Sequence, residues 1–282
     1  MMSGVASAPG SSGNLGPGFD CVALALDLRC EVKAVPADEW ALEQDGETRL
    51  PAEGDYVVRA VRAAVDMPMH LTIENAIPRS RGLGSSSAVA AAAAAAARRA
   101  LDLPCGAAEL FEMVSGLEGH ADNAAAAVYG GLVLTSSSGG WRHLELSPRL
   151  RFVVAVPDEK LSTHRARAAL PAAVRLSAAA RNLSRLGFLI EGLRTGEPGA
   201  FLEAAGDELH EGPRRDLSPI TGELMDVARA AGALHAAWSG AGPSALAFCL
   251  DDAVTDVMSA LERRLGGAGS VRELSVALEG IC

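Results

Sequence analysis

The chain has 282 residues and a net charge of −10 at pH 7; 49% of its residues are hydrophobic but only 4% are aromatic. This length allows one large domain or two ordinary ones, with a core built mainly from Ala, Val and Leu. The negative charge argues against nonspecific binding to nucleic acid.

The cysteine and histidine content gives no sign of a disulfide framework or a zinc site. Five cysteines are scattered without a Cys-x-x-Cys pair, and the six histidines show no zinc-ligand spacing. This pattern is typical of free thiols in a reducing cytoplasm. The first residues lack a basic segment followed by an apolar one, and the alanine-rich run 88–97 is too short to span a bilayer. We therefore expect a cytoplasmic protein that binds neither membrane nor nucleic acid.

Apolar periodicity and turn-forming residues predict the elements of the first half. Residues 5–35 are expected to be extended around a loop at 10–18, and periodicity does not decide whether 19–28 is a strand or a short helix. Asp55 is placed to cap a helix that runs to Val65. The further predicted elements are a strand over 70–75, a glycine- and serine-rich loop, an alanine-rich helix over 88–97, a helix over 107–117, and a hairpin with strand 130–135 and turn 136–140.

The second half is predicted to contain more helix. The elements expected there are a strand over 152–157, helices over 168–183, 185–194, 200–209 and 220–231, strands over 233–238 and 245–250, a helix over 252–265 and a strand over 273–278. Strands and helices do not alternate regularly, which favours an α+β fold over a parallel doubly wound one. We place a domain boundary after the glycine-rich hairpin, giving domains 1–150 and 151–282.

The strongest local signal is the loop that precedes the alanine-rich helix. Glycines allow backbone amides to approach a ligand, and a helix start offers unpaired amide hydrogens and partial positive charge. Such a loop binds anions, and a nucleotide phosphate is the expected one. No lysine follows Gly84, as a Walker A loop requires, and Ser87 stands where a protein-kinase loop has its third glycine. The residues expected to bind the nucleotide are Pro78, Arg79, Ser80, Arg81, Gly82, Leu83, Gly84, Ser85, Ser86, Ser87 and Ala88.

Four other clusters are candidate sites, and each also has an ordinary structural explanation. Asn14 and Asp20 bracket a turn, where they can hold a hydroxyl or ammonium group or satisfy their own backbone. Residues 118–123 form either a site at a helix start or a surface loop with an Asp cap. Turn 239–244 either braces the glycine- and serine-rich loop 78–88, called the phosphate loop below, or only joins two strands. Arginine forks match carboxylates, although most arginines are simply solvated; the candidates are Arg165, Arg167, Arg214 and Arg215.

These motifs occur in an order that resembles the GHMP small-molecule kinases, and within that family the homoserine kinases. The resemblance is carried by S-G-N-L-G-P-G-F-D at 12–20, by 78–88 and by 239–244, with similar segments at 118–123 and 161–171. It implies a two-domain α+β kinase whose N-terminal domain has a left-handed βαβ unit and whose C-terminal domain is ferredoxin-like. It also implies a homodimer that uses ATP and Mg²⁺ to phosphorylate the L-homoserine hydroxyl, a step of threonine biosynthesis.

The resemblance further implies roles for single residues. Ser86 and Glu112 would hold Mg²⁺, with Glu118 as the alternative carboxylate; Glu112 is chosen because it lies ten residues before Asp122. The general base stays open, although Asp122 is a candidate, and no residue is assigned to adenine. The residues expected to bind homoserine are Asn14, Asp20, Asp122 and Asn123 at its amino and hydroxyl ends, and Thr163, Arg167 and Arg214 toward its carboxylate.

Some positions depart from the family pattern, and three other functions stay open. Gly13 replaces the usual alanine, and Gly212-Pro213 replaces Pro-Tyr before Arg214, which makes Arg215 an alternative ligand. The acceptor could instead be mevalonate, a sugar or shikimate. A serine hydrolase would use 84–88 as its nucleophile elbow, with His120 and Asp122 as partners, but the elbow requires a strand directly before the serine. The third alternative is a regulator that binds a nucleotide without turning it over.

Overall fold

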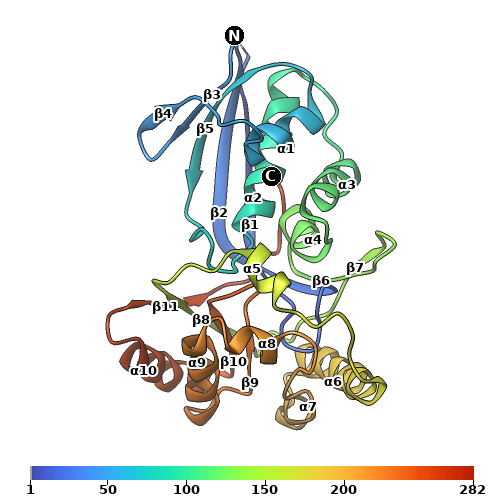
Figure 1. Cartoon of the computed structure of the whole chain (residues 1–282), viewed down its shortest axis with the longest axis vertical. Coiled ribbons are helices and arrows are strands. Elements are labelled where there is room, and N and C mark those ends of the chain that lie inside the picture. Colours follow the sequence, from blue (N-terminus) through green and yellow to red (C-terminus); the bar gives the residue numbers. More distant parts are fainter. Residues whose placement is uncertain (1) are drawn as a thin grey trace.

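Two β-sheets organise the molecule, and the structure, a computed structural model, describes residues 2–282. The first sheet has the order β4-β3-β5-β2-β6-β7, with β1 also paired to β2, and the second has the order β11-β8-β10-β9. The first sheet and its helices form the upper part of Figure 1, and the second sheet lies below them. The strands are β1 (Gly4–Gly13), β2 (Val22–Pro36), β3 (Ala41–Gln44), β4 (Glu47–Arg49), β5 (Met69–Asn75), β6 (Leu132–Thr135), β7 (Trp141–His143), β8 (Arg151–Pro157), β9 (His235–Trp238), β10 (Ala245–Cys249) and β11 (Gly269–Leu274).

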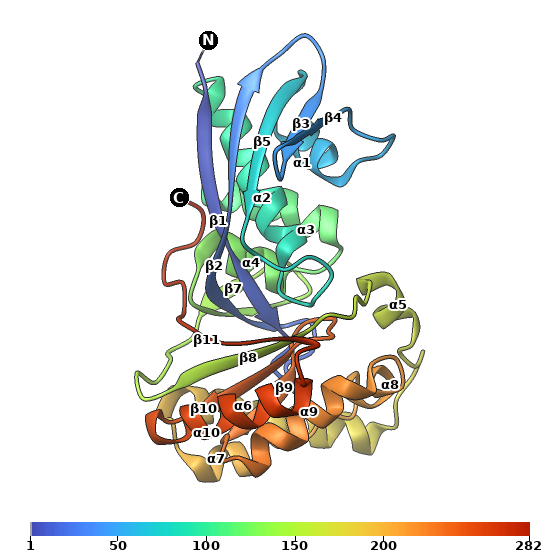
Figure 2. The same cartoon turned by 90° about the vertical axis from the view of Figure 1, so that its left-hand side faces the viewer.

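Four helices cover one face of the first sheet and four more belong mainly to the second part (Figure 2). The short helix α5 lies where the two parts meet, and the short helix α8 lies beside α9 in the second part. The helices are α1 (Tyr56–Ala64), α2 (Ser85–Ala100), α3 (Ala107–Glu118), α4 (Asp122–Tyr129), α5 (Thr163–Ala168), α6 (Leu176–Thr195), α7 (Pro198–Glu203), α8 (Glu211–Arg215), α9 (Pro219–Ala230) and α10 (Val254–Leu265), the last preceded by a 3₁₀ turn, η1 (Asp251–Ala253).

Helix α2 is the centre of the upper part and packs directly on β1 and β2. It is buried from Ser87 to Ala97, as expected for a helix that is apolar on all sides. Its alanines permit a very close approach, because a Cβ added at Gly4 would lie 2.1 Å from the Ala96 carbonyl oxygen. This packing fixes the start of α2, and therefore the loop before it, relative to the first sheet.

The second sheet has the strand order of a ferredoxin-like domain. Numbered along the chain, its four strands pair in the order 4-1-3-2, and all the pairs are antiparallel. Alternate residues of β8 face different cores: Val153 joins a core with α9 and α10, whereas Phe152 joins the large core shared with the first sheet, α6 and α7. The two parts are therefore packed through a common apolar layer.

The predicted α+β fold is confirmed, and so are most of its elements. Asp55 caps α1, its carboxylate accepting from the Val57 amide at 2.9 Å. The uncertain segment 19–28 is strand from Val22 onward. Strand 70–75, helix 107–117, the hairpin, strand 152–157 and the elements of 220–265 all lie close to their predicted positions.

Several predictions of local structure were wrong or incomplete. Residues 10–13 continue strand β1 rather than starting a loop, and the short strands β3 and β4 were missed. Helices 168–183 and 185–194 are one helix, α6, because no glycine or proline separates them, while 163–168 forms the separate α5. The helix predicted over 200–209 ends at Glu203.

The last strand also lies earlier than predicted, over 269–274, because the residues after it leave the second sheet. Val276 bridges to Leu26 of β2, and the Ser7 amide donates to the Cys282 carbonyl at 2.8 Å. The chain end thus returns to the first sheet, and the domain boundary near residue 150 stays a prediction. Within residues 2–282 no helix combines the length and apolarity needed to cross a membrane.

Candidate active site

A cleft of about 400 Å³ opens where the upper and lower parts meet. The upper part contributes the phosphate loop, the start of α2 and the segment between α3 and α4. The lower part contributes α5, α8 and the turn after β9. The predicted residues that line the cleft are Asn14, Asp20, Pro78, Arg79, Ser80, Arg81, Gly82, Leu83, Gly84, Ser85, Ser86, Ser87, Asp122, Asn123, Thr163, Arg167 and Arg214.

The phosphate loop presents backbone amides at the start of α2. Gly84 is the N-cap with φ of +66°, and no side chain caps the first turn. The amides of Ser85, Ser86 and Ser87 therefore stand at the positive end of the helix without a capping partner, which is a site suited to an anion. The Ala88 amide donates to the Gly84 carbonyl at 3.0 Å, and Ala88 lies outside the cleft, so its predicted role in nucleotide binding does not fit its position.

The turn after β9 braces this loop. A Cβ at Gly82, whose φ is +74°, would lie 2.1 Å from the Ser239 carbonyl oxygen, so the two backbones are in direct contact. Ser239 Oγ donates to the Gly82 carbonyl at 2.8 Å. On the other side, a Cβ at Gly84 would lie 2.1 Å from Ser11 Oγ. The loop is thus held between β1 and the turn 239–242. This turn therefore braces the phosphate loop and does more than join two strands.

Two basic side chains of the loop are engaged away from its amides. Arg81 donates to the carbonyls of Pro157 and Asp158, and Arg79 donates to Gln44. Arg81 therefore connects the loop to the end of β8. Any anion on this loop would be held chiefly by the backbone.

The carboxylate beside the loop is Glu118, and Glu112 is not part of the cleft. Ser86 Oγ donates to Glu118 Oε2 at 3.2 Å, and the Tyr56 hydroxyl donates to Glu118 Oε1. Glu112 is exposed on α3. Six residues rotate a helix by roughly 600°, which turns these two carboxylates about 120° apart. Spacing along the sequence therefore selected the wrong side of α3, and the alternative carboxylate is the one that faces Ser86.

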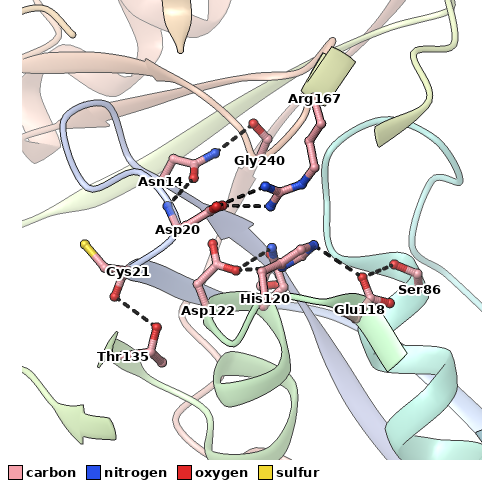
Figure 3. A network of polar contacts seen from close by, with 12 residues as sticks. Asn14, Asp20, Cys21, Ser86, Glu118, His120, Asp122, Thr135, Arg167 and Gly240 are labelled. Carbon is pink, nitrogen blue, oxygen red and sulfur yellow. Dashed lines mark hydrogen bonds and ion pairs between the residues drawn. The ribbon is translucent and has the colours of Figure 1, made fainter. Parts of the chain in front are cut away.

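A polar network extends from Glu118 to the start of α4 (Figure 3). His120 Nδ1 lies 3.0 Å from Asp122 Oδ1, and the Asn123 side-chain amide lies 3.3 Å from the same oxygen. Ser11 Oγ donates to Asn123 Oδ1 at 2.8 Å. Burial opposes protonation of His120, but the hydrogen bond and charge of Asp122 raise its pKa above the ordinary value. Asp122 itself is only 1% exposed.

Asp20 and Arg167 form a two-bond ion pair across the cleft. Arg167 Nη1 and Nη2 donate to Asp20 Oδ2 and Oδ1 at 2.9 and 2.7 Å. Asn14, which has φ of +72°, holds the loop that carries Asp20, because its Nδ2 donates to the Gly240 carbonyl at 2.9 Å and its Oδ1 accepts from the Asp20 amide at 3.0 Å. This ties the first motif to the turn 239–242 (Figure 3).

Arg214 is the second guanidinium of the cleft. It is 2% exposed, and burial together with nearby Arg167 lowers its pKa to about 10. Arg215, the alternative, points elsewhere, because it is exposed and pairs with Asp226 at 3.2 Å. Thr163 is exposed at the first position of α5. This end of the cleft thus combines the carboxylates of Asp20 and Asp122 with two guanidiniums, an arrangement complementary to a zwitterion.

The residues at the other end of the cleft were not assigned a role from the sequence. Those residues come from β3, β4 and the start of α1 and include Gln44, Arg49, Asp55, Tyr56 and Val57. The one feature predicted here from the sequence was the helix cap at Asp55. These residues line the same cleft as the phosphate loop, Asp20 and Arg167.

The geometry contradicts the serine hydrolase alternative. Strand β5 ends at Asn75, so no strand runs directly into the serines. Among the described contacts, Ser86 donates to Glu118, and His120 contacts Asp122 and Glu118 rather than a serine hydroxyl. Within the described residues, the serines of 84–88 form no nucleophile–base pair with His120.

Comparison with known proteins identifies related chains over the whole length. Residues 55–131 match the family model for the N-terminal domain of GHMP kinases, and 189–267 match that for the C-terminal domain. The homoserine kinase of Moorella thermoacetica is 38% identical to this chain, over 96% of this chain and 97% of that one. The homoserine kinase of Thermus thermophilus is 37% identical, over 95% of this chain and 94% of that one.

Solved structures give the same result for the fold. The crystal structure of homoserine kinase from Cytophaga hutchinsonii superposes with a TM-score of 0.88 at 25% identity, covering 100% of this chain and 97% of that one. A mevalonate kinase of Methanococcus jannaschii, 14% identical, shares the fold with a TM-score of 0.75 over 97% and 98% of the two chains.

Proposed function

Because this chain belongs to the GHMP kinase family, among its homoserine kinases, we propose that it transfers the γ-phosphoryl group of ATP to the side-chain hydroxyl of L-homoserine. The products are O-phospho-L-homoserine and ADP. The observation that carries this proposal is a single cleft that combines an anion-binding loop with a charged pocket suited to an α-amino acid. Phosphoryl transfer requires mainly alignment and charge stabilisation, and this arrangement supports both.

The nucleotide phosphates bind over the loop 80–87 and the start of α2. Uncapped amides at a helix start stabilise negative charge before and during transfer. Tyr56 and Val57 line the end of the cleft assigned to the base and ribose. The braced backbone of Gly82 and Gly84 keeps these amides in place, so little reorganisation accompanies the reaction.

Ser86 and Glu118 are suited to Mg²⁺. A hydroxyl and a carboxylate beside phosphate oxygens are the hard oxygen ligands that Mg²⁺ prefers, and it usually takes only one or two carboxylates from the protein. The ion supplies charge neutralisation at the transferred phosphoryl group. Tyr56 holds Glu118 beside Ser86, so these two side chains would hold the ion together.

The acceptor binds between Asp20 and Arg167. Its ammonium group pairs with Asp20, and its carboxylate pairs with Arg167 and Arg214, so the substrate replaces the bidentate pair between Asp20 and Arg167. Asp122 and Asn123 then lie toward the hydroxyl. Mevalonate and shikimate carry a carboxylate without an ammonium group, and sugars lack both; the carboxylate of Asp20 therefore favours an amino acid over these alternatives.

Asp122 is assigned to substrate binding rather than to general base catalysis. Its Oδ1 is engaged by both His120 and Asn123, which holds the carboxylate in place. If Asp122 binds substrate, Asp122→Asn raises mainly the KM for homoserine. If it is an obligatory base, the same variant loses turnover at nearly unchanged KM.

The decisive test is ADP release from ATP and Mg²⁺ with each acceptor in turn. Homoserine should stimulate ADP release well above the acceptor-free rate, and mevalonate, galactose and shikimate should not. A protein that phosphorylates one of the other alcohols much faster than homoserine refutes the assignment of the acceptor. A protein that binds ATP but turns over with none of them is the regulator rather than the enzyme.

A further inference from the structure

One edge of the Arg214 guanidinium is fully used inside the protein. Nη1 donates to the Gly240 carbonyl and to His210 Nδ1, both at 2.9 Å. Nη1 carries two hydrogens, so these two acceptors occupy it completely. Nε is buried and has no partner among the described residues. Only the edge formed by Nε and Nη2 is left for a ligand in the cleft.

The contacts of His210 determine its tautomer. Its Nε2 lies 2.8 Å from the Gly16 carbonyl oxygen, which can only accept, so Nε2 carries the hydrogen. Nδ1 then has a free lone pair and accepts from Arg214. The ring is fully buried and stacks on Phe19, with 5.2 Å between ring centroids. Burial lowers the pKa of His210 to about 4 despite the nearby carboxylate of Asp207, so the ring is neutral near pH 7.

The structure assigns His210 as a positioning residue that turns the free edge of Arg214 toward the substrate carboxylate and couples it to the turn that carries Asp20. This inference rests on the proposed function, because it takes Arg214 as a ligand of that carboxylate. An arginine side chain has many rotamers, and two fixed acceptors on Nη1 restrict them before the substrate arrives. The bond to Gly16 connects the same ring to the loop 14–20.

A second buried histidine provides a matched comparison. His235 Nε2 lies 3.2 Å from the Leu15 carbonyl, next to the carbonyl that His210 binds. Burial also lowers the pKa of His235 to about 4. The difference is at Nδ1, since that atom of His235 is buried without a partner among residues 2–282. The two histidines therefore share the contact with the loop, and only His210 contacts Arg214.

Three variants separate these contacts. Glutamine keeps a donor near the Nε2 position but has no acceptor at Nδ1, whereas asparagine keeps an acceptor near Nδ1 and loses the link to the loop. His210→Gln should raise the KM for L-homoserine by about tenfold, the size of a lost hydrogen bond to a charged group. His210→Asn should restore most of that affinity. His235→Gln should leave the homoserine KM within about twofold of wild type, because its Nδ1 has no partner to lose.

The KM for ATP and thermal unfolding distinguish positioning from loss of structure. Positioning leaves the ATP KM of His210→Gln close to wild type. With 3-aminopropan-1-ol, which retains the ammonium and hydroxyl groups but lacks the carboxylate, His210→Gln and wild type should differ by less than about twofold.

The inference is overturned if His210→Gln keeps a wild-type homoserine KM while Arg214→Lys raises it; the proposed function then stands. The inference is also overturned if His210→Gln raises the KM equally for homoserine and 3-aminopropan-1-ol, or equally for homoserine and ATP. If the wild-type protein does not phosphorylate homoserine at all, it is the proposed function that fails.

Discussion

Replacing Gly82 by alanine tests whether a rigid backbone contact holds the phosphate loop. Gly82 has φ of +74°, and its Cα faces the turn after β9. An added Cβ would lie 2.1 Å from the Ser239 carbonyl oxygen and 2.6 Å from the Gly242 nitrogen. Both neighbours are backbone atoms, so no side chain can rotate away, and the loop itself must move.

The size of the effect follows from these distances. Ordinary contact of a Cβ begins near 3.4 Å, so relief of the overlap requires a shift of more than 1 Å. A misplacement of roughly 1 Å near reacting groups costs on the order of 100-fold in rate, or about 2.7 kcal/mol in transition-state stabilisation. The left-handed conformation adds about 1–2 kcal/mol of strain to the folded state. We expect kcat/KM for ATP to fall about 100-fold or more.

The matched control is Gly139→Ala in the turn between β6 and β7. Gly139 has φ of +83°, with no atom of residues 2–282 within 4 Å of the added Cβ, and it lies outside the cleft. It carries the same backbone strain without the collision. Steady-state ADP release against ATP concentration measures the activity, and thermal unfolding measures the strain. If both variants retain wild-type kcat/KM for ATP, the backbone contact does not hold the loop and the reasoning is wrong.

Three further predictions follow from the site and the buried groups. Glu118→Gln should lower kcat by about 100-fold or more by removing a Mg²⁺ ligand, whereas Glu112→Gln should leave it unchanged; equal losses in Mg²⁺-titrated assays would contradict the assignment. His235 has a folded pKa near 4, below its unfolded value of 6.5, so it destabilises the fold by up to about 3 kcal/mol as pH falls from 6.5 to 4. In urea titrations, the free energy of unfolding should fall less over this pH range in His235→Gln than in wild type. Parallel pH profiles for the two proteins would contradict this prediction. Asp55→Ala should cost about 1 kcal/mol by uncapping α1, measured by the same urea titration; an unchanged midpoint would show that the cap contributes nothing.

The sequence allowed the fold and the phosphate loop to be predicted because both depend on local patterns. The short apolar run of β8, the Asp55 cap and the glycine loop before an alanine-rich helix are each visible within a few residues. Elements that form by pairing with distant parts of the chain were harder to predict. Strands β3 and β4 are short, and the chain end leaves the second sheet to pair with β2, which no local pattern indicates.

The candidate site shows the same limit. Residue types identified Asp20, Asp122, Arg167 and Arg214 as candidates, and all four line one cleft. The choice of Glu112 failed because counting along the chain ignores which face of a helix a residue occupies. Residues of the β3–α1 region were missed because a single tyrosine or arginine near a helix start has no distinctive spacing.

The catalytic geometry depends on how the two parts of the molecule are joined. Neither part alone holds a complete site, since the phosphate loop and Asp122 belong to the upper part and Arg167 and Arg214 to the lower. Besides the shared apolar layer and several side-chain bonds, two main-chain bonds join the parts: the Gly240 amide donates to the Gly13 carbonyl at 3.0 Å, and the Leu161 amide donates to the Ser80 carbonyl at 3.2 Å. The first bond lies beside the Asp20 turn and the second leads into α5, which carries Arg167. These contacts help to set the distance between the phosphate loop and Arg167. A change at these joints should raise the KM for homoserine and lower kcat more than it raises the KM for ATP, because the proposed homoserine pocket spans both parts whereas the phosphate loop belongs to one.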